Sequence, residues 1–178
     1  MKSVFLIVGK SASGKDTLVN MLCKNGYKQV CSYTTRPRRI GEGETHIFIT
    51  PEEVNQYEKD MVAYTKIGTF QYFATRQQLE DADFYVIDPQ GVKYMKQAMK
   101  DIRLVTIYIN LDDNSRFGFA LKRQDNLGTL IKRFIDESEQ FKEFALNGDY
   151  DYAITNKDLA TSLAVLTEII KIERLNDD

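Results

Sequence analysis

Two glycines and a lysine near the N-terminus have the spacing of a phosphate-binding loop. The segment is Gly9-Lys10-Ser11-Ala12-Ser13-Gly14-Lys15-Asp16-Thr17, in which four residues separate the two glycines. Glycines let the backbone turn tightly, so that successive N–H groups point at one anion, and a lysine at this position reaches the outer phosphates of a nucleotide. The segment therefore predicts a P-loop that binds a nucleoside triphosphate.

The residue after Lys15 departs from the usual P-loop pattern. Asp16 stands where such loops carry the serine or threonine that contacts magnesium, and a hydroxyl follows one position later, at Thr17. Asp16 either faces the metal, directly or through water, or points away and leaves the metal contact to Thr17. We expect Mg²⁺ as a cofactor, with both residues as candidate ligands.

A second candidate anion site is the segment 36–39, Arg-Pro-Arg-Arg, which has three arginines in four positions. The planar guanidinium group matches two phosphate oxygens at once and keeps its charge at any working pH. The alternative is a solvated basic loop that Glu42 and Glu44 neutralise. Beside a P-loop in the same chain, a second phosphate site is the better interpretation. Two such sites indicate phosphate transfer from a nucleotide to another phosphorylated molecule.

The elements that must position these loops alternate along the chain. Apolar runs predict strands at 4–8, 28–31, 84–87, 105–109 and 152–154. Amphipathic patterns predict helices at about 15–24, 91–99, 113–122, 130–144 and 159–173. Such alternation is typical of an α/β fold with a parallel sheet, whose ligands bind at the carboxyl ends of the strands. We expect a P-loop NTPase fold with a mostly parallel, five-stranded sheet.

The alternation breaks between residues 33 and 83, where the chain is polar and carries several prolines and glycines. We expect an inserted small lobe that binds the phosphate acceptor, within a single domain of residues 1–178. The expected parts are a core at 1–32 and 84–178, the lobe at 33–83 and a lid at about 121–132.

Composition narrows the possible partners. The chain has 178 residues, 43% of them hydrophobic, and a net charge of −2. It is therefore long enough to bury one substantial core, and it has no overall charge that would attract nucleic acid or an anionic membrane. No apolar stretch is long enough to cross a bilayer. We expect a cytoplasmic monomer or homodimer that binds small-molecule nucleotides but neither nucleic acid nor membrane.

Several segments together resemble guanylate kinase, in the same order and over nearly the whole chain. They are 32–42 (Ser-Tyr-Thr-Thr-Arg-Pro-Arg-Arg-Ile-Gly-Glu), 43–48 (Gly-Glu-Thr-His-Ile-Phe), 72–76 (Tyr-Phe-Ala-Thr-Arg), 88–92 (Asp-Pro-Gln-Gly-Val) and 150–156 (Tyr-Asp-Tyr-Ala-Ile-Thr-Asn). The resemblance implies transfer of the γ-phosphate of ATP to GMP with magnesium, in a site over which the small lobe and the lid close.

The resemblance also implies roles for single residues. For ATP it implies Gly9, Ser11, Ala12, Ser13, Gly14, Lys15, Asp16 and Thr17, with Asn156 near the adenine. For the acceptor it implies Ser32, Arg36, Arg39, His46, Tyr72 and Asp88, the last also near the magnesium. Arg123 and Arg133 fall in or near the lid, where they would bridge the phosphates and act in catalysis with Lys15 and Arg36. Asn156 has an equally good alternative role as the residue that ends a strand in a turn.

The departures from the family fall on the side that binds the base. Ala63 stands where the family has a glutamate that accepts hydrogen bonds from guanine, and Ala74 and Val86 replace a hydroxyl and an acidic side chain. His46 takes the place of a tyrosine. A buried guanine would lack its acceptor here, and each unpaired donor costs on the order of 1–3 kcal/mol. The phosphate-binding residues are retained, while base specificity stays open.

Three functions are compatible with this pattern. The favoured one is an ATP-dependent kinase of a nucleoside monophosphate, with GMP or dGMP as the acceptor. The second is a kinase of another phosphorylated metabolite, such as the guanylate kinase-like enzyme that acts on ribose 1,5-bisphosphate, whose P-loop resembles Gly-Lys-Asp-Ser/Thr. The third is a non-catalytic module that binds phosphopeptides, which the intact Gly9, Gly14 and Lys15 disfavour.

Overall fold

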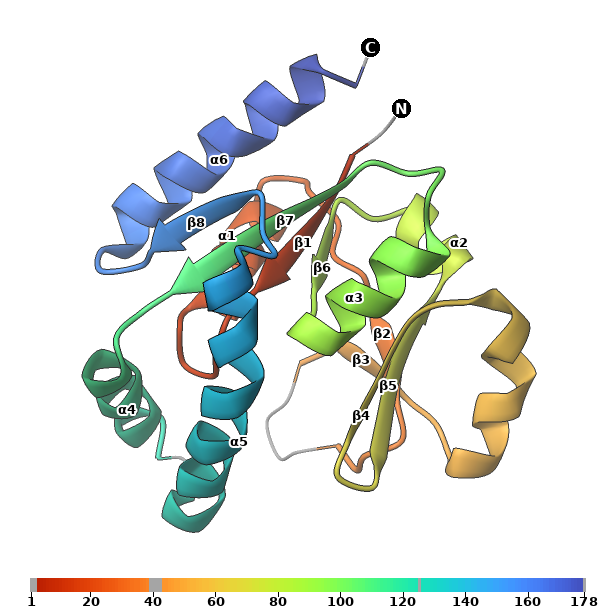
Figure 1. Ribbon diagram of the computed structural model, residues 1–178, viewed down its shortest axis with the longest axis horizontal. Coiled ribbons are helices and arrows are strands. Elements are labelled where there is room, and N and C mark those ends of the chain that lie inside the picture. The colour runs from red at the N-terminus through yellow and green to blue at the C-terminus, as the bar shows by residue number, and fades with distance from the viewer. Residues whose placement is uncertain (1–2, 39–42, 125, 178) are drawn as a thin grey trace.

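The first apolar run forms a fully buried strand, β1 (Val4–Val8), inside a parallel sheet (Figure 1). The computed structural model describes residues 3–38, 43–124 and 126–177. Within these ranges the sheet has the order β6-β1-β7-β8, and all of its pairings are parallel. Its other strands are β6 (Phe84–Val86), β7 (Leu104–Asn110) and β8 (Tyr152–Thr155). The predicted α/β fold is confirmed, and the run lacks polar residues because both faces of the sheet are covered.

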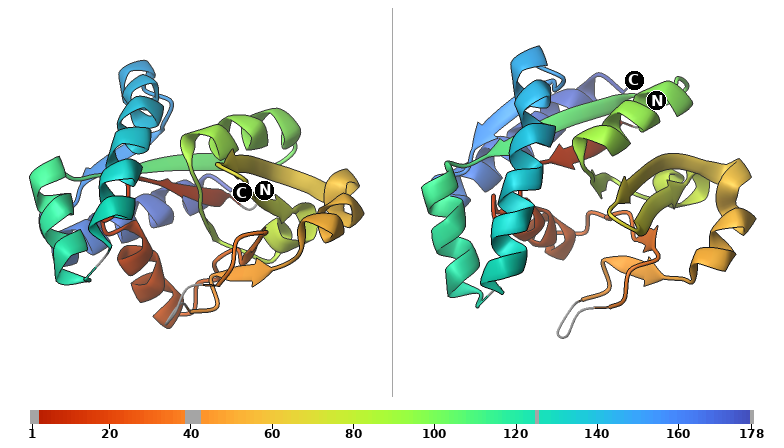
Figure 2. Two further views of the ribbon diagram at one scale, coloured as in Figure 1. Left: turned by 90° about the horizontal axis from the view of Figure 1, so that it is seen from below. Right: turned by 60° about the horizontal axis from the view of Figure 1, so that its bottom comes forward.

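Helices cover the two faces of this sheet (Figure 2). They are α1 (Lys15–Lys24), α3 (Pro89–Ala98), α5 (Leu127–Asn147) and α6 (Leu159–Leu175). Helix α4 (Asp113–Lys122) lies beyond the carboxyl ends of the strands, beside α5 (Figure 1). Side chains alternate along a strand, so Phe5 and Ile7 of β1 pack with residues of α1 and α6. Leu6 packs on the other face, where α3 and α5 contribute Met95 and Phe141.

The predicted strand at 28–31 is wrong, because this segment forms only an isolated bridge between Gln29 and Phe84. The Lys28 carbonyl accepts from the N–H groups of Asp83 and Phe84, and the Val30 N–H donates to Phe84. After this short contact the chain leaves β6 and enters a second sheet. The central sheet of the described residues therefore has four strands rather than five.

The second sheet is formed by the segment in which the alternation breaks. Its order is β3-β2-β5-β4, with β2 and β3 parallel and the other pairs antiparallel. The strands are β2 (Ser32–Thr34), β3 (His46–Phe48), β4 (Met61–Ile67) and β5 (Phe70–Thr75). A 3₁₀ helix, η1 (Pro51–Asp60), and a short helix, α2 (Arg76–Glu80), complete this part and were not predicted. We call this sheet and its two helices the small lobe; it begins at Ser32, one residue before the predicted boundary.

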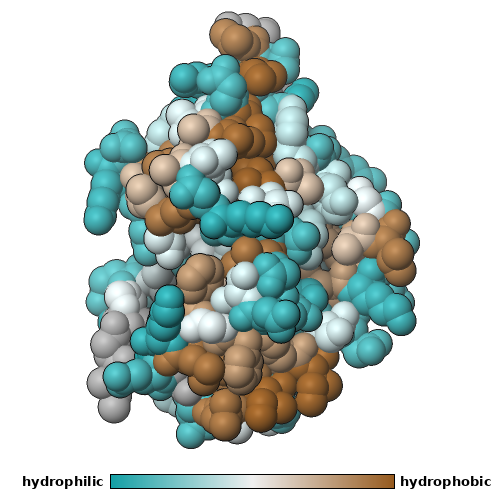
Figure 3. Space-filling model, turned by 90° about the vertical axis from the view of Figure 1, so that its left-hand side faces the viewer, coloured by the Kyte–Doolittle hydropathy of each residue, from teal (hydrophilic) through white to brown (hydrophobic). Residues whose placement is uncertain are grey.

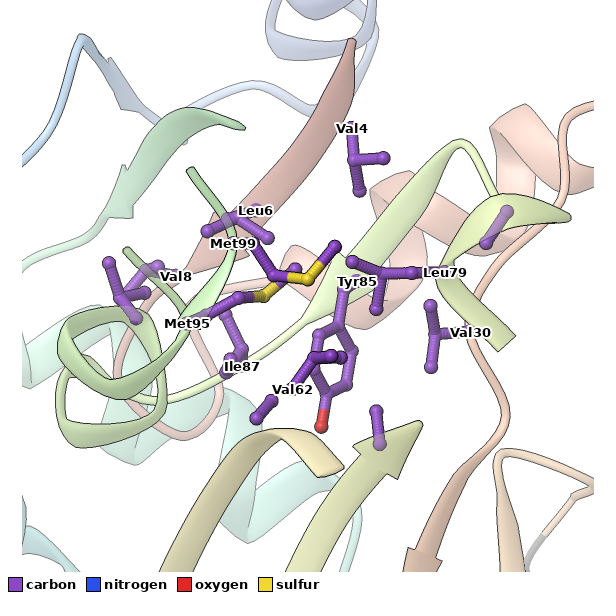
Figure 4. Close-up of a cluster of buried hydrophobic side chains, with 14 of the residues drawn as sticks. Val4, Leu6, Val8, Val30, Val62, Leu79, Tyr85, Ile87, Met95 and Met99 are labelled. Atoms are coloured by element: carbon purple, nitrogen blue, oxygen red, sulfur yellow. The ribbon is translucent and has the colours of Figure 1, made fainter. Parts of the chain in front are cut away.

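The small lobe and the central sheet share one cluster of buried side chains (Figure 4). Val62 of β4 lies in this cluster with Leu6 of β1 and Met95 of α3. Tyr85 of β6 lies between them, and its hydroxyl points towards the small lobe (Figure 4). The shared cluster holds the small lobe beside the central sheet, because separating them would expose these apolar side chains to water.

The predicted lid region lies where α4 ends and α5 begins. Lys122 is the last residue of α4, and Asn126 caps α5 by accepting a hydrogen bond from the Thr129 N–H at 3.1 Å. The described part of 121–132 is thus mostly helical. Apolar side chains gather at one end of the face that shows these helices (Figure 3). Exposed apolar residues of α4 and α5 include Phe119, Leu121, Leu127, Ile131 and Ile135.

Candidate phosphate-transfer site

The loop between β1 and α1 requires glycine at two positions. Gly14 has φ of +88°, and a Cβ there would lie 2.2 Å from Asn156 Nδ2. A Cβ on Gly9 would lie 2.6 Å from the Ile109 carbonyl oxygen in β7. No described side chain caps the first turn of α1, so its N–H groups remain available to an anion. A phosphate cradle remains a prediction, with which the two glycines and the uncapped helix start agree.

Lys15 and Asp16 form an ion pair at the start of α1, with Lys15 Nζ 3.2 Å from Asp16 Oδ2. Lys15 is mostly covered, while the Asp16 side chain is 64% exposed. Desolvation in the cleft opposes the charged form of Asp16, but the charge and hydrogen bond of Lys15, a backbone hydrogen bond and the charge of Arg123 together hold the pKa of this carboxyl below its usual value. Asp16 is therefore an anion at neutral pH, within the first turn of α1.

Arg36 and its neighbours lie on the small lobe. The Arg36 side chain is only 7% exposed, donates to the Pro37 carbonyl at 2.9 Å and packs over the Phe48 ring. Strand pairing sets Ser32 beside His46, and Ser32 Oγ lies 2.9 Å from His46 Nδ1. Buried cations of this kind are held by neighbouring groups before any ligand arrives. The predicted Arg39 lies outside the described residues.

Asp88 follows β6 and caps α3. Its Oδ1 accepts hydrogen bonds from the N–H groups of Gln90 and Gly91, at 2.8 and 3.0 Å, and from Gln140 Nε2 of α5, at 3.2 Å. The carboxylate is thereby fixed just beyond the carboxyl end of β6, on the side of the central sheet at which α/β proteins bind ligands.

One cleft of about 650 Å³ brings most of the predicted residues together. They line it from the P-loop, the small lobe, β6 and α5: Gly9, Ser11, Lys15, Asp16, Ser32, Arg36, His46, Tyr72, Asp88 and Arg133. Other predicted residues lie outside its lining: Ala12, Ser13, Gly14, Thr17, Arg123 and Asn156. Thr17 is exposed on the first turn of α1, and Arg123 is exposed at the end of α4.

Asn156 lies under the P-loop rather than in the cleft. It is 7% exposed, and its Nδ2 donates to the Ser13 carbonyl at 2.8 Å. This hydrogen bond ties the end of β8 to the loop, and the Asn156 amide leaves no room for a side chain at Gly14.

The wall on which an acceptor base would lie is apolar and hydroxyl-bearing. Ala63 and Val86 line the cleft, and Ala63 pairs with Ala74 across β4 and β5. Tyr85 also lines it; burial raises the pKa of its phenol, although a hydrogen bond with Ser32 opposes the shift. Tyr85 was not predicted, because in sequence it is one more apolar residue of a buried strand.

Two charged residues that the sequence did not single out contact the P-loop. Arg116 of α4 donates from Nε to the Ser11 carbonyl at 2.8 Å, and Glu137 of α5 accepts from the Ser11 N–H at 2.8 Å. Arg116 is 1% exposed. In the sequence, Arg116 stands four residues before the apolar Ala120, which places both side chains on the same, buried face of α4.

Comparison with known proteins decides the family. The family model described as guanylate kinase matches residues 1–173. The chain belongs to the guanylate kinase family. As a member of the guanylate kinase family it is a nucleoside monophosphate kinase, a phosphotransferase.

Curated relatives of this guanylate kinase-family chain are similar over nearly their whole length. The guanylate kinase of Photorhabdus laumondii is 27% identical over 188 residues, covering 98% of this chain and 89% of the relative. The guanylate kinase of Escherichia coli K12 is 28% identical over 191 residues, which cover 97% of this chain and 89% of the relative. The crystal structure of guanylate kinase from Anaplasma phagocytophilum has a TM-score of 0.68 at 24% identity, covering 96% of this chain and 86% of that one, and supports the fold. The two alternative functions find no support in these comparisons.

None of the helices in the described part of the chain is both long and apolar enough to cross a membrane.

Proposed function

We propose that the protein transfers the γ-phosphate of ATP to GMP or dGMP, giving ADP and the nucleoside diphosphate. The observation that carries this proposal is the single cleft in which Lys15 of the P-loop and Arg36 of the small lobe both lie. A phosphoryl group moves between two bound molecules only when both are held in line in the same water-poor space. The curated relatives named guanylate kinase favour a guanine nucleotide as the acceptor.

On the donor side, the N–H groups of the P-loop and of the first turn of α1 would bind the ATP phosphates. Gly9 and Gly14 permit the close approach, and Lys15 would neutralise the outer phosphates. Asp16 would face the same phosphates from the cleft lining, and Ser11, whose N–H and hydroxyl donate to Glu137, would hold the shape of the loop beside them. Ala12 contributes backbone, whereas Ser13 and Asn156 support the loop from behind.

On the acceptor side, Arg36 would bind the monophosphate, together with Arg39 and Tyr72. A buried guanidinium suits this task because its fork binds two phosphate oxygens at once. Ser32 and His46, which already contact one another, would hydrogen-bond the acceptor from the small lobe.

The residues present fit a magnesium ion that is held mainly by phosphates. Among the described residues, His, Cys, Asp and Glu form no group of three or more that could bind a metal alone. Mg²⁺ beside a nucleotide needs only one or two carboxylate or hydroxyl contacts besides phosphate and water. The exposed Asp16 and Thr17 would supply these on the donor side, and Asp88 would face them across the cleft. When bound, the ion would neutralise charge on the transferring phosphate.

Cations complete the site during transfer. Arg133 of α5 lies in the cleft lining, and Arg123 stands at the end of α4, close enough to Asp16 for its charge to lower the pKa of that carboxyl. Both would stabilise the charge that spreads over the phosphoryl oxygens, provided that the helix ends move over the cleft.

The test is a coupled assay of ADP formation from ATP and magnesium, with GMP, dGMP, AMP, CMP, UMP and ribose 1,5-bisphosphate as acceptors. We expect turnover with GMP or dGMP, and Lys15→Ala should lower it by about 100-fold or more, since it removes a charge that acts on the transferring group. Lys24→Ala, at the exposed other end of α1, is the matched control and should keep wild-type activity.

Two results would overturn the proposal. One is wild-type turnover by a folded Lys15→Ala variant, which would remove the P-loop from the chemistry. The other is turnover of ribose 1,5-bisphosphate with none of any nucleoside monophosphate.

A further inference from the structure

Arg116 is the largest fully buried side chain of the described residues, yet it lies outside the cleft lining. Its guanidinium meets three partners: Nε donates to the Ser11 carbonyl at 2.8 Å, Nη1 to Asp113 at 2.5 Å and Nη2 to Glu137 at 2.5 Å. It also lies 4.1 Å from the centre of the Phe134 ring. One buried cation thus joins α4, α5 and the P-loop.

Glu137 completes the contact from α5. One of its carboxylate oxygens binds Arg116, and the other accepts from the N–H and the hydroxyl of Ser11, at 2.8 and 2.5 Å. The Ser11 N–H belongs to the peptide that joins residues 10 and 11, and the Ser11 carbonyl to the next peptide. Two successive peptide planes of the P-loop are therefore fixed by Glu137 and Arg116.

The residue after this point has an uncommon backbone conformation. Ala12 has φ of +60°, in the left-handed region that residues with a side chain rarely adopt. The angle φ of Ala12 describes rotation relative to the peptide whose carbonyl Arg116 holds. Such conformations persist where surrounding contacts determine them.

We infer that Arg116 and Glu137 are positioning residues: they hold the P-loop in its left-handed turn at Ala12 before a nucleotide binds. This inference rests on the proposed function, since the loop is taken to bind ATP. The same contacts dock α5 against the loop, and Arg133, one turn before Glu137, lies in the cleft. Arg116 and Glu137 thereby set both the cradle for the donor phosphates and the place of a cation beside them.

The test measures ATP binding by calorimetric titration with magnesium, beside thermal unfolding of each variant. Arg116→Met should weaken ATP binding by about 10-fold or more, since a loop free to leave the left-handed turn must be reordered by the ligand. The KM for GMP should stay within about twofold, because the acceptor is held from the small lobe. Glu137→Gln, which keeps the shape of the side chain, should weaken ATP binding in the same direction.

A second substitution that restores ATP binding distinguishes a positioning role of Arg116 from a general effect on stability. Ala12→Gly removes the penalty of the left-handed turn, so Arg116→Met/Ala12→Gly should bind ATP several-fold more tightly than Arg116→Met alone. The matched control is Arg103→Met, which breaks another arginine–glutamate pair, between the start of β7 and Glu173 of α6. It should lower the unfolding temperature and leave the Kd for ATP within about twofold.

The inference is overturned if folded Arg116→Met and Glu137→Gln bind ATP as the wild type does, or if Ala12→Gly restores nothing. If the wild-type protein itself does not bind ATP, the proposed function fails instead. The two failures are thus told apart by the wild-type titration.

Discussion

Ala63 is the residue at which this chain differs most consequentially from the family pattern. Its side chain is 1% exposed and lines the cleft, as does Val86, on the wall where an acceptor base would lie under the proposed function. Hydroxyl groups nearby, such as those of Ser32 and Tyr85, can donate as well as accept, whereas a carboxylate only accepts. A wall of this kind pairs with the edges of several bases, so discrimination for guanine should be weak.

Ala63→Glu should therefore raise the preference for GMP over AMP, expressed as the ratio of kcat/KM values, by about 10-fold or more, because a carboxylate pairs with the guanine donors. The measurement is the acceptor panel under identical ATP and magnesium. Ala160→Glu adds the same charge at an exposed site on α6 and should leave the ratio unchanged. An unaltered ratio in folded Ala63→Glu would show that the base lies elsewhere.

Single residues also show where prediction from sequence ends. Gly9, Gly14 and Lys15 were predicted because their chemistry is local: turn, helix start and cation follow one another along the chain. Arg116 and Glu137 contact Ser11 from 105 and 126 positions away, and no local pattern encodes such a pairing. Asn156 was assigned to the adenine by resemblance, whereas its side chain supports the P-loop backbone.

At the scale of single elements, one carboxylate makes the stability of α6 depend on pH. Asp158 precedes α6 and accepts from the hydroxyl and the N–H of Thr161, at 2.6 and 2.8 Å. These hydrogen bonds hold the pKa of Asp158 below its usual value of 3.8. The pKa of Asp158 is thus lower in the folded than in the unfolded protein. The ionised carboxylate therefore stabilises the folded state above pH 3.8, and this stabilisation is lost as the pH falls through the folded pKa.

Asp158→Asn should accordingly lower the unfolding temperature at pH 6 and approach the wild type in acid, since asparagine caps without a charge. Thermal unfolding of both proteins from pH 6 down to about pH 2.5 measures the difference between their unfolding temperatures. Asp60→Asn, which removes an exposed charge at the end of η1, serves as the control. A difference in unfolding temperature that grows as the pH falls would contradict the stabilising role of the ionised Asp158.

Element prediction succeeded where a periodic pattern had clear ends. The predicted bounds of α1 and α4 coincide with the structure. Helix α5 is longer than predicted, from Leu127 to Asn147, because its ends are set by the Asn126 cap and by Gly148 in a left-handed conformation. The strand at 28–31 failed because an apolar run shows only that a segment is buried, and this one pairs too briefly with β6 to continue as a strand.

At the scale of the whole molecule, the cleft lies between the small lobe and the helical side of the central sheet. The small lobe supplies one wall and α5 another, while the P-loop forms the base between them. Transfer requires exclusion of water, and release requires reopening. Because the small lobe shares a core cluster with α3, closure should be a limited rotation rather than a separation.

Small-angle scattering should show a smaller radius of gyration when a non-hydrolysable ATP analogue, GMP and magnesium are all present than with no ligand. With either nucleotide alone, the radius of gyration should lie between these two values, since each nucleotide would move only one wall of the cleft inwards. The Lys15→Ala variant under the same conditions serves as the control. Superimposable profiles with and without the ligands would exclude closure.

The α/β class could be predicted at this scale, since it follows from the order of patterns along the chain, and the break in that order marks the segment that forms the second sheet. The mixed pairing of the lobe, its junction with the central sheet at Tyr85 and the docking of α5 on the P-loop could not. These arrangements depend on contacts between distant segments, which one sequence does not reveal.

The two ends of the described chain meet at one place. The Ser3 N–H and hydroxyl donate to the Asp177 carboxylate, at 2.9 and 2.5 Å, and both ends lie on the side away from the small lobe (Figure 1). A tag or surface tether attached at either end would therefore leave the molecule from the same side. Immobilised by either end, the enzyme would present the small lobe to the solution.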